Sequence, residues 1–228
     1  MNISGNAVAM PWTAKVPAIV QGWFIGSEAG EAIASVLVGD ANPSGKLPFT
    51  WPASLQDVGA HKLNTYPGTW REGNQIIDEE YKESIYVGYR WADKEKTKPT
   101  FAFGHGLSYT TFAYGKAVAD KKVMGADETL TVTVPVTNTG NREGAEVVQL
   151  YISDLKSSLP RPVKELKGFS KVRLAPGETK EVTFTIGKDA LSFYDDARHE
   201  WVAEPGKFEA VVAASATDIR SKVPFELK

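Results

Sequence analysis

The stretch Thr129-Leu-Thr-Val-Thr-Val-Pro-Val-Thr137 decides the fold of the larger part of the chain. Its apolar residues stand at every second position and alternate mostly with threonine. This alternation is typical of a β-strand that buries one face and exposes the other. The turn signal Asn138-Thr-Gly-Asn141 follows the stretch directly, so the predicted strand ends there.

Three later segments repeat the alternation. Their apolar residues are Val148, Leu150 and Ile152, then Val182, Phe184 and Ile186, and finally Phe208, Ala210 and Val212. Pro176-Gly177 and Pro205-Gly206 mark turns between them. Short strands with turns over about 100–120 residues are typical of an immunoglobulin or fibronectin type III sandwich. Because the chain has no cysteine, the fibronectin-like variant is favoured, and residues 108–228 are predicted to form it.

Residues 1–52 follow an α/β pattern instead. The mostly apolar run Val16–Phe24 predicts a buried strand, and Ser27 is a suitable N-cap for a helix after it. Lys46–Trp51 predicts a short edge strand because it contains proline. The apolar stripe expected on the helix consists of Ala29, Ile33, Val36 and Leu37. One strand–helix–strand unit cannot cover its own sheet, so we expect the incomplete end of an α/β domain. The predicted fold class is therefore an α/β fragment followed by an all-β immunoglobulin-like sandwich.

Residues 53–107 connect the two regions and show little periodicity. A connection of this length is usually functional or packs over a neighbouring domain. The aromatic run from Tyr86 to Trp91 is best explained by such packing. Trp70 is different, because it stands in a glycine-flanked loop where its ring could stack on the C–H face of a sugar.

The stretch Phe103-Gly-His-Gly-Leu-Ser-Tyr-Thr-Thr-Phe112 poses the question of a His105–Ser108 catalytic pair. A nucleophilic serine needs a base and a third group that orients the base, and the Gly-x-Ser-x-Gly signature is absent. We therefore interpret it as a structural joint in which Gly104 and Gly106 make the turn. In this joint Tyr109 would act as an anchor, and His105 would hydrogen-bond locally.

The composition excludes several classes of function. A formal net charge of −2 leaves no basic footprint for nucleic acid or an anionic membrane. No apolar run approaches the roughly 20 residues that span a bilayer, and no signal peptide is visible. His61 and His199 lack acidic residues at metal-ligand spacing, so no metal is predicted. No cofactor motif is present either, because a β-sandwich and not a helix follows Gly104 and Gly106.

Six motifs together resemble the C-terminal part of glycoside hydrolase family 3 β-glucosidases. They are Pro11-Trp12, Val20–Ala34, Gly39–Pro48, Tyr86-Val-Gly-Tyr89, Phe103–Phe112 and Lys164-Glu-Leu-Lys-Gly-Phe169. The resemblance covers essentially the whole chain. It implies the end of an α/β sandwich domain over 1–52, a connector packed on neighbouring domains over 53–107, and a fibronectin type III-like domain over 108–228. A departure is Ser84, where the family often has glycine.

The resemblance also implies a retaining enzyme that hydrolyses terminal non-reducing β-D-glucosyl residues. In the family the nucleophilic aspartate lies in a barrel domain, and the acid/base glutamate lies upstream of the part that resembles Pro11-Trp12. Neither has a counterpart in this chain, which we therefore expect to be inactive alone and to serve as structural support. Trp70 and Arg71 are candidates for the rim of the substrate site. A bacterial parent enzyme would be periplasmic or secreted.

The carboxylates of the chain agree with this absence of catalytic residues. Glycoside hydrolysis needs two carboxyl groups about 5–9 Å apart, one of them held protonated. Glu28 and Glu31 lie in the first helical turn, which favours their charged forms. The remaining candidates are expected to be solvated surface groups, namely Asp195, Asp196, Glu79, Glu80 and Glu83. No catalytic pair is predicted.

Two expectations concern partners. Residues 1–52 should expose apolar surface, so we expect either a separate N-terminal catalytic portion bound to them or self-association. The alternative to an enzyme part is a stand-alone fibronectin-like module that binds carbohydrate or protein. Carbohydrate binding would require exposed coplanar aromatic rings, and the candidates are Tyr151, Tyr194 and Trp201.

Overall fold

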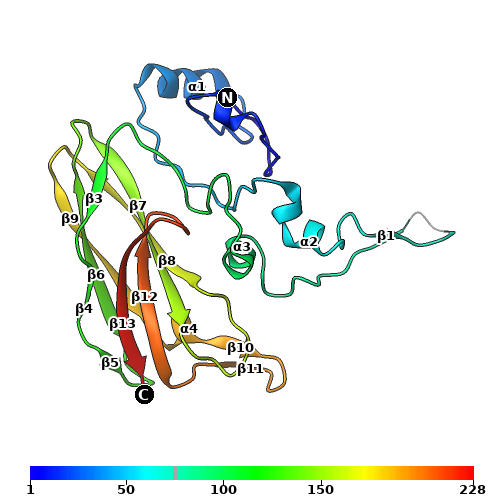
Figure 1. The fold of residues 1–228 in the computed structure, drawn as a ribbon. Coiled ribbons are helices and arrows are strands. Elements are labelled where there is room, and N and C mark those ends of the chain that lie inside the picture. Colours follow the sequence, from blue (N-terminus) through cyan, green and yellow to red (C-terminus); the bar gives the residue numbers. More distant parts are fainter. Residues whose placement is uncertain (74–75) are drawn as a thin grey trace. The chain divides into compact units, whose positions relative to one another are not determined.

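The structure is a computed structural model that describes residues 1–73 and 76–228. These residues form two compact units (Figure 1). Unit 1 contains residues 1–43 and 47–103, and unit 2 contains residues 44–46 and 104–228.

Unit 2 is a sandwich of two β-sheets (Figure 1). The five-stranded sheet has the order β5-β13-β12-β7-β8, and the other is built around β6, which pairs with β9 on one side and with β3 and β4 on the other. Its strands are β3 (Phe112–Tyr114), β4 (Val118–Ala119), β5 (Val123–Met124), β6 (Leu130–Asn138), β7 (Gly144–Asp154), β8 (Glu165–Leu174), β9 (Thr179–Ile186), β12 (Gly206–Ala213) and β13 (Ile219–Leu227). The short helix α4 (Lys188–Leu191) and the hairpin β10 (Phe193–Asp195) with β11 (Glu200–Val202) lie between β9 and β12.

The predicted alternation is confirmed in this sandwich. Along β6 every second residue is buried, from Leu130 to Asn138. The apolar residues predicted on β7, β9 and β12 all belong to one hydrophobic core together with those of β6. Burying one large apolar side chain stabilises a fold by roughly 1.5–3 kcal/mol, so this core is the main source of stability of unit 2.

A proline in the middle of β6 is accommodated by a break in the neighbouring strand. Pro135 has no N–H to donate, and it lies between the positions that pair with β3 and those that pair with β4. Its carbonyl accepts a hydrogen bond from the Gly115 N–H at 2.8 Å. A Cβ at Gly115 would lie 2.5 Å from the Pro135 ring, so only glycine fits opposite this proline.

Five strands of the sandwich are absent from the sequence-based prediction: the short strands β3, β4 and β5, and the long strands β8 and β13. β8 has mostly half-buried and exposed residues, so its pattern is weak. β13 contains Pro224, which argues against a central strand. The structure places Pro224 opposite Glu209 of β12, whereas β5 pairs only with Glu226 and Leu227. The proline therefore lies where β13 has one neighbour.

A buried ion cluster fixes the segment between β7 and β8. The Arg161 guanidinium lies 3.1 Å from the Asp154 carboxylate and 2.6 Å from that of Glu165, and all three side chains are largely buried. Arg161 also donates to the Leu191 carbonyl at 2.7 Å. These charge-assisted bonds tie the loop after β7 to the end of α4.

Unit 1 contains short elements and long irregular segments. They are the 3-10 helices η1 (Thr13–Lys15) and η2 (Leu55–Asp57), the helices α1 (Ala29–Val38), α2 (Gly59–Lys62) and α3 (Tyr89–Glu95), and the hairpin strands β1 (Thr69–Trp70) and β2 (Ile77–Asp78). Trp51 is 1% exposed, and its indole donates to the Val8 carbonyl at 2.7 Å. Around it pack Trp23 and Phe49, with ring centroids 5.3–6.5 Å apart.

The two strands predicted within residues 1–52 are wrong as local assignments. Val16–Phe24 makes a single bridge, between Gln21 and Asn2, and Lys46–Trp51 makes one between Trp51 and Phe101. A strand needs a neighbour along its length, and in the described parts of the chain neither segment has more than this. Apolar composition alone did not reveal whether a neighbouring strand was available for pairing.

Helix α1 corrects two further expectations. Its N-cap is Glu28 and not Ser27, and that residue makes no side-chain capping bond. None of its residues is buried, and Leu37, predicted to lie on the packed stripe, is 66% exposed. No helix in the described residues is long and apolar enough to cross a membrane.

Candidate functional site

The hairpin β1–β2 of unit 1 carries the first candidate site residue, Trp70. Trp70 pairs with Ile77 across the hairpin, and its side chain is 64% exposed. Gly68 precedes the hairpin with a φ of +88°, and a Cβ there would lie 2.5 Å from the Asp78 carbonyl oxygen. Glycine is thus required for the chain to enter this hairpin, which presents the indole face to solvent.

Arg71 follows Trp70 and is held by the same hairpin. Its Nε donates to Asp78 Oδ2 at 3.0 Å, its Nη2 donates to Asp78 Oδ1 at 2.5 Å, and both side chains are about half exposed. A guanidinium has five N–H donors, so this bidentate pair orients Arg71 while donors remain for a ligand. An exposed ring beside oriented donors suits a sugar, which combines an apolar face with hydroxyl groups.

The four residues predicted to form the joint lie at the start of unit 2, where close packing explains both glycines. Gly104 has a φ of +78°, and a Cβ there would lie 2.3 Å from Gln149 Oε1. A Cβ at Gly106 would lie 2.1 Å from the Gly45 carbonyl oxygen. Gln149 is 3% exposed and donates to the carbonyls of Gly104 and Ala214. The joint is therefore fixed by a buried amide of β7.

At this joint His105 is half-buried and Tyr109 is exposed. Burial lowers the pKa of His105, and the positive charge of Lys46 lowers it further, while Asp218 opposes the shift. Tyr109 is 46% exposed, and the Arg142 guanidinium lies 5.7 Å from its ring centroid. The hydroxyl of Ser108 accepts a hydrogen bond from the Thr110 N–H at 3.3 Å, which is a local turn contact.

A buried ion pair beside the joint was not anticipated. Lys46 donates to the Gly106 carbonyl at 2.8 Å and lies 3.1 Å from Glu146, which is 6% exposed. The Tyr114 hydroxyl donates to the same carboxylate at 3.1 Å, and its pKa is raised by burial and by the Glu146 charge. Glu146 and Gln149 are polar residues within the apolar pattern of β7. Buried polar residues of this kind are the one signal that could have indicated this network.

The carboxylates considered from the sequence do not gather into one site. Glu28 and Glu31 stand at the start of α1, while Asp195 belongs to the β10–β11 hairpin and accepts from the N–H groups of Ala197 and Arg198. The expectation that Glu83 is a solvated surface group is wrong, because its Oε2 is buried without a hydrogen-bond partner among the described residues. Among those residues, no group of three or more His, Cys, Asp and Glu could hold a metal ion.

The aromatic candidates on the sandwich do not form a flat platform. Tyr151 is fully buried, and its hydroxyl donates to Gln149 Oε1 at 2.6 Å, so it is wrong as an exposed sugar contact. Tyr194 and Trp201 are 49% and 69% exposed and face each other across the β10–β11 hairpin. Their planes meet at 66°, which is an edge-to-face pair and not a coplanar one.

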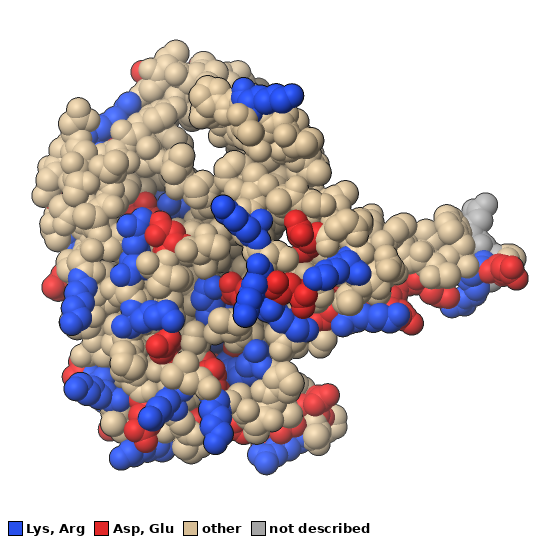
Figure 2. Space-filling model, viewed as in Figure 1, with Lys and Arg blue, Asp and Glu red and all other residues tan. Residues whose placement is uncertain are grey.

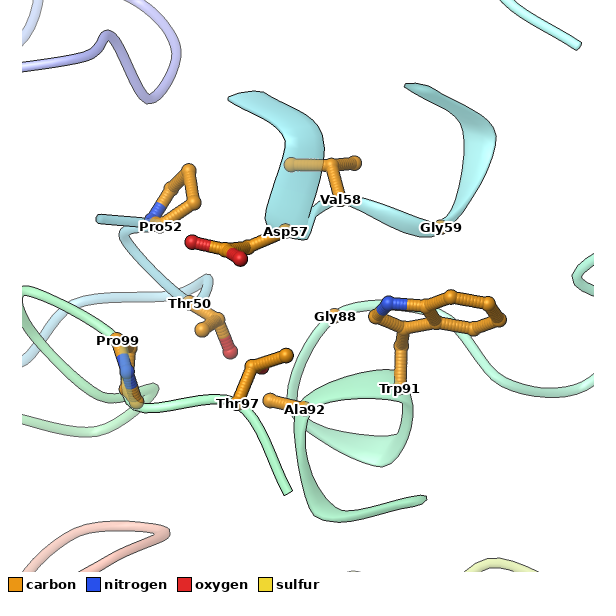
Figure 3. Close-up of a pocket in the computed structure, with 10 residues that line it drawn as sticks. All are labelled: Thr50, Pro52, Asp57, Val58, Gly59, Gly88, Trp91, Ala92, Thr97 and Pro99. Carbon is orange, nitrogen blue, oxygen red and sulfur yellow. The ribbon is translucent and has the colours of Figure 1, made fainter. Parts of the chain in front are cut away.

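Unit 1 also contains a small pocket beside α3 (Figure 3). Its volume is about 80 Å³, and η2, α3 and the segments next to them supply its walls. Trp91, which is 4% exposed, turns the nitrogen-bearing edge of its indole toward the middle of the pocket (Figure 3). Trp91 therefore packs within unit 1, among residues of the connector itself.

Comparisons with known proteins identify the family. Residues 1–109 match the glycosyl hydrolase family 3 C-terminal domain, and residues 146–216 match a fibronectin type III-like domain. A β-glucosidase of Bacteroides ovatus, BoGH3A, is 54% identical over 226 residues, which are 98% of this chain and 30% of that protein. A thermostable β-glucosidase B of Acetivibrio thermocellus is 44% identical over 95% of this chain and 28% of its own length.

Solved structures agree with this result. The β-glucosidase of Kluyveromyces marxianus in complex with glucose is 42% identical with a TM-score of 0.88, over 100% of this chain and 26% of its own. β-Glucosidase 3B of Thermotoga neapolitana is 40% identical with a TM-score of 0.86, over 96% and 30%. The chain thus spans less than a third of the length of these relatives, and the expected fold class is confirmed. It belongs to glycosyl hydrolase family 3, and it corresponds to the C-terminal part of the members that are named β-glucosidases.

Proposed function

We propose that this chain is the C-terminal portion of a retaining β-glucosidase that releases terminal non-reducing β-D-glucosyl residues. The observation that carries the proposal is the 54% identity with the Bacteroides ovatus β-glucosidase across 98% of the chain. A match of this identity along nearly the whole chain supports the same elements and the same role within a longer enzyme.

The catalytic carboxyl groups would come from the portion of the enzyme outside this chain. A retaining glycosidase needs one carboxylate nucleophile and one carboxyl group whose pKa is raised, so that it can act as an acid. In this chain the pKa values of Glu95, Glu128, Glu178 and Glu204 are lowered by hydrogen bonds from their neighbours. These shifts favour the charged form, which suits structural contacts and not acid catalysis.

The role of this chain would be to support the catalytic portion. Around α1 the visible face of unit 1 carries few charged side chains (Figure 2). Phe24, Leu37 and Val38 are 87%, 66% and 72% exposed. Apolar side chains exposed to this degree favour coverage by another surface. We infer that the catalytic portion, or a second copy of the chain in its absence, covers residues 1–52.

Trp70 and Arg71 would then contribute to the rim of the substrate site. The exposed indole offers a stacking face, and the Arg71 guanidinium is oriented by Asp78. A substrate reaching the rim would stack on Trp70 and accept hydrogen bonds from Arg71. For the bacterial parent enzyme we propose a periplasmic or secreted location, which fractionation of the host cells would test.

A chimera tests the proposed function. The segment of the Bacteroides ovatus enzyme that matches this chain is replaced by the chain itself, and hydrolysis of an aryl-β-glucoside is measured. We expect the chimera to keep hydrolytic activity within about tenfold of the parent, and nuclear magnetic resonance to show β-glucose as the first product. The isolated chain of 228 residues should show no turnover.

The outcomes separate the parts of the proposal. Turnover by the isolated chain would overturn the placement of the catalytic carboxyls elsewhere, and α-glucose as first product would overturn retention. A folded but inactive chimera would contradict the supporting role. Substituting Trp70→Ala in the active chimera should raise KM more than it lowers kcat, whereas Trp201→Ala on the β10–β11 hairpin serves as an exposed tryptophan control.

A further inference from the structure

The pocket beside α3 contains two buried polar atoms that no group in the described residues satisfies. They are the indole Nε1 of Trp91 and the hydroxyl oxygen of Thr50. An indole nitrogen can only donate, whereas a hydroxyl can donate or accept. Buried polar groups are nearly always hydrogen-bonded, so two unsatisfied ones on the wall of one pocket call for a common explanation.

The chemistry of the walls defines what fits between these atoms. The Trp91 N–H edge faces the middle of the pocket, with Thr50 and the Asp57 carboxylate on the opposite side (Figure 3). Asp57 Oδ2 accepts from the Ser54 N–H at 3.0 Å, so this carboxylate is held in place. An occupant must accept a hydrogen bond from Trp91, it can donate to Asp57, and it can donate to Thr50 or accept from it. A hydroxyl-type oxygen does both.

Such an oxygen could belong to a sugar or to a water, and the size of the pocket decides between them. Pockets that hold organic ligands measure roughly 300–1,000 Å³, whereas a water needs only roughly 10–15 Å³ of accessible space. A volume of about 80 Å³ is too small for a sugar ring and sufficient for water. Buried waters typically make about three hydrogen bonds, which matches the groups available here.

We propose that this pocket is a hydration site in which ordered water bridges Trp91 Nε1 and Thr50 Oγ1. The bridge joins the chain around Thr50 to helix α3. Gly59 contributes to the arrangement, because a Cβ there would lie 3.0 Å from the Trp91 ring. A larger residue at position 59 would push the indole and move its N–H away from the water.

Two measurements on the intact chain test this site. A high-resolution crystal structure should show a water oxygen within about 3.2 Å of both atoms. In solution, the Trp91 indole proton should show a nuclear Overhauser effect to water with the sign of a long-lived contact. The indole of Trp201, 69% exposed, is the matched control for rapidly exchanging solvent.

The variant Thr50→Val keeps the shape of the side chain and removes its hydroxyl. We expect it to weaken the Trp91–water signal at least threefold, while Thr50→Ser preserves the signal. A dry pocket, a protein acceptor on the Trp91 nitrogen, or an unchanged signal in a folded Thr50→Val variant would each overturn the proposal. If Thr50→Val fails to fold, the crystal structure of the natural sequence still decides the proposal, because it shows whether a water lies within reach of both atoms.

Discussion

Replacing Gly104 with alanine tests the packing of the joint at the start of unit 2. An alanine at the φ of +78° costs about 1–2 kcal/mol, because its Cβ meets the backbone. The same Cβ would lie 2.3 Å from Gln149 Oε1 and force this buried amide to move. Loss of its bonds to Gly104, Ala214 and Tyr151 leaves buried polar groups unsatisfied, at about 1–3 kcal/mol each.

With the strain and one such group left unsatisfied, the expected total is a loss of roughly 2–5 kcal/mol, against a domain stability of about 5–15 kcal/mol. The assay is urea unfolding of the natural chain and the variant, followed through amide resonances of β7. The matched control is Gly177→Ala, because Gly177 has a φ of +74° and open space at its Cβ position. This control should lose only about 1–2 kcal/mol.

The comparison of the two alanines decides the matter. If Gly104→Ala costs no more than Gly177→Ala, the contact with Gln149 has no energetic weight and the reasoning fails. A double variant with Gln149→Ala gives a second test, since removal of the amide makes room for the new Cβ. Its cost should then be smaller than the sum of the two single variants by at least about 1 kcal/mol.

Three further predictions concern other sites. Ser84 has a φ of +55°, so Ser84→Gly should raise the free energy of unfolding of unit 1 by up to about 1 kcal/mol, and a loss would contradict strain at this residue. Arg161→Met should cost roughly 3–5 kcal/mol in urea unfolding, because it removes the guanidinium that pairs with the buried Asp154 carboxylate, and a cost below about 1 kcal/mol would refute this. Burial and the charge of Lys46 lower the pKa of His105, so the unfolded chain binds a proton at His105 more readily than the folded chain does. The stability of unit 2 should therefore fall as the pH drops below 6.5. His105→Gln should flatten this dependence of stability on pH, and an unchanged slope would contradict the assignment.

The sequence by itself determined the sandwich and the family. Period-two alternation in β6, β7, β9 and β12 is a local signal, and the residues it marked share one core. The motif around Gly104 and Gly106 was legible in the same way, since glycine is the residue that tolerates unusual backbone angles and close approach. Strand signals were lost where composition is mixed, as in β8, where a proline intervenes, as in β13, and in the two- and three-residue strands β3, β4 and β5.

Only the tertiary structure decided which of the other signals correspond to real contacts. The apolar run Val16–Phe24 could not show that it makes a single bridge within the described residues, because strand pairing is a property of two segments. Nor could Lys46, Glu146 and Gln149 be assigned to the joint, since they lie far from it in sequence. The same holds for the orphaned atoms of Thr50 and Trp91, because hydrogen bonding and burial arise only when distant segments meet in space.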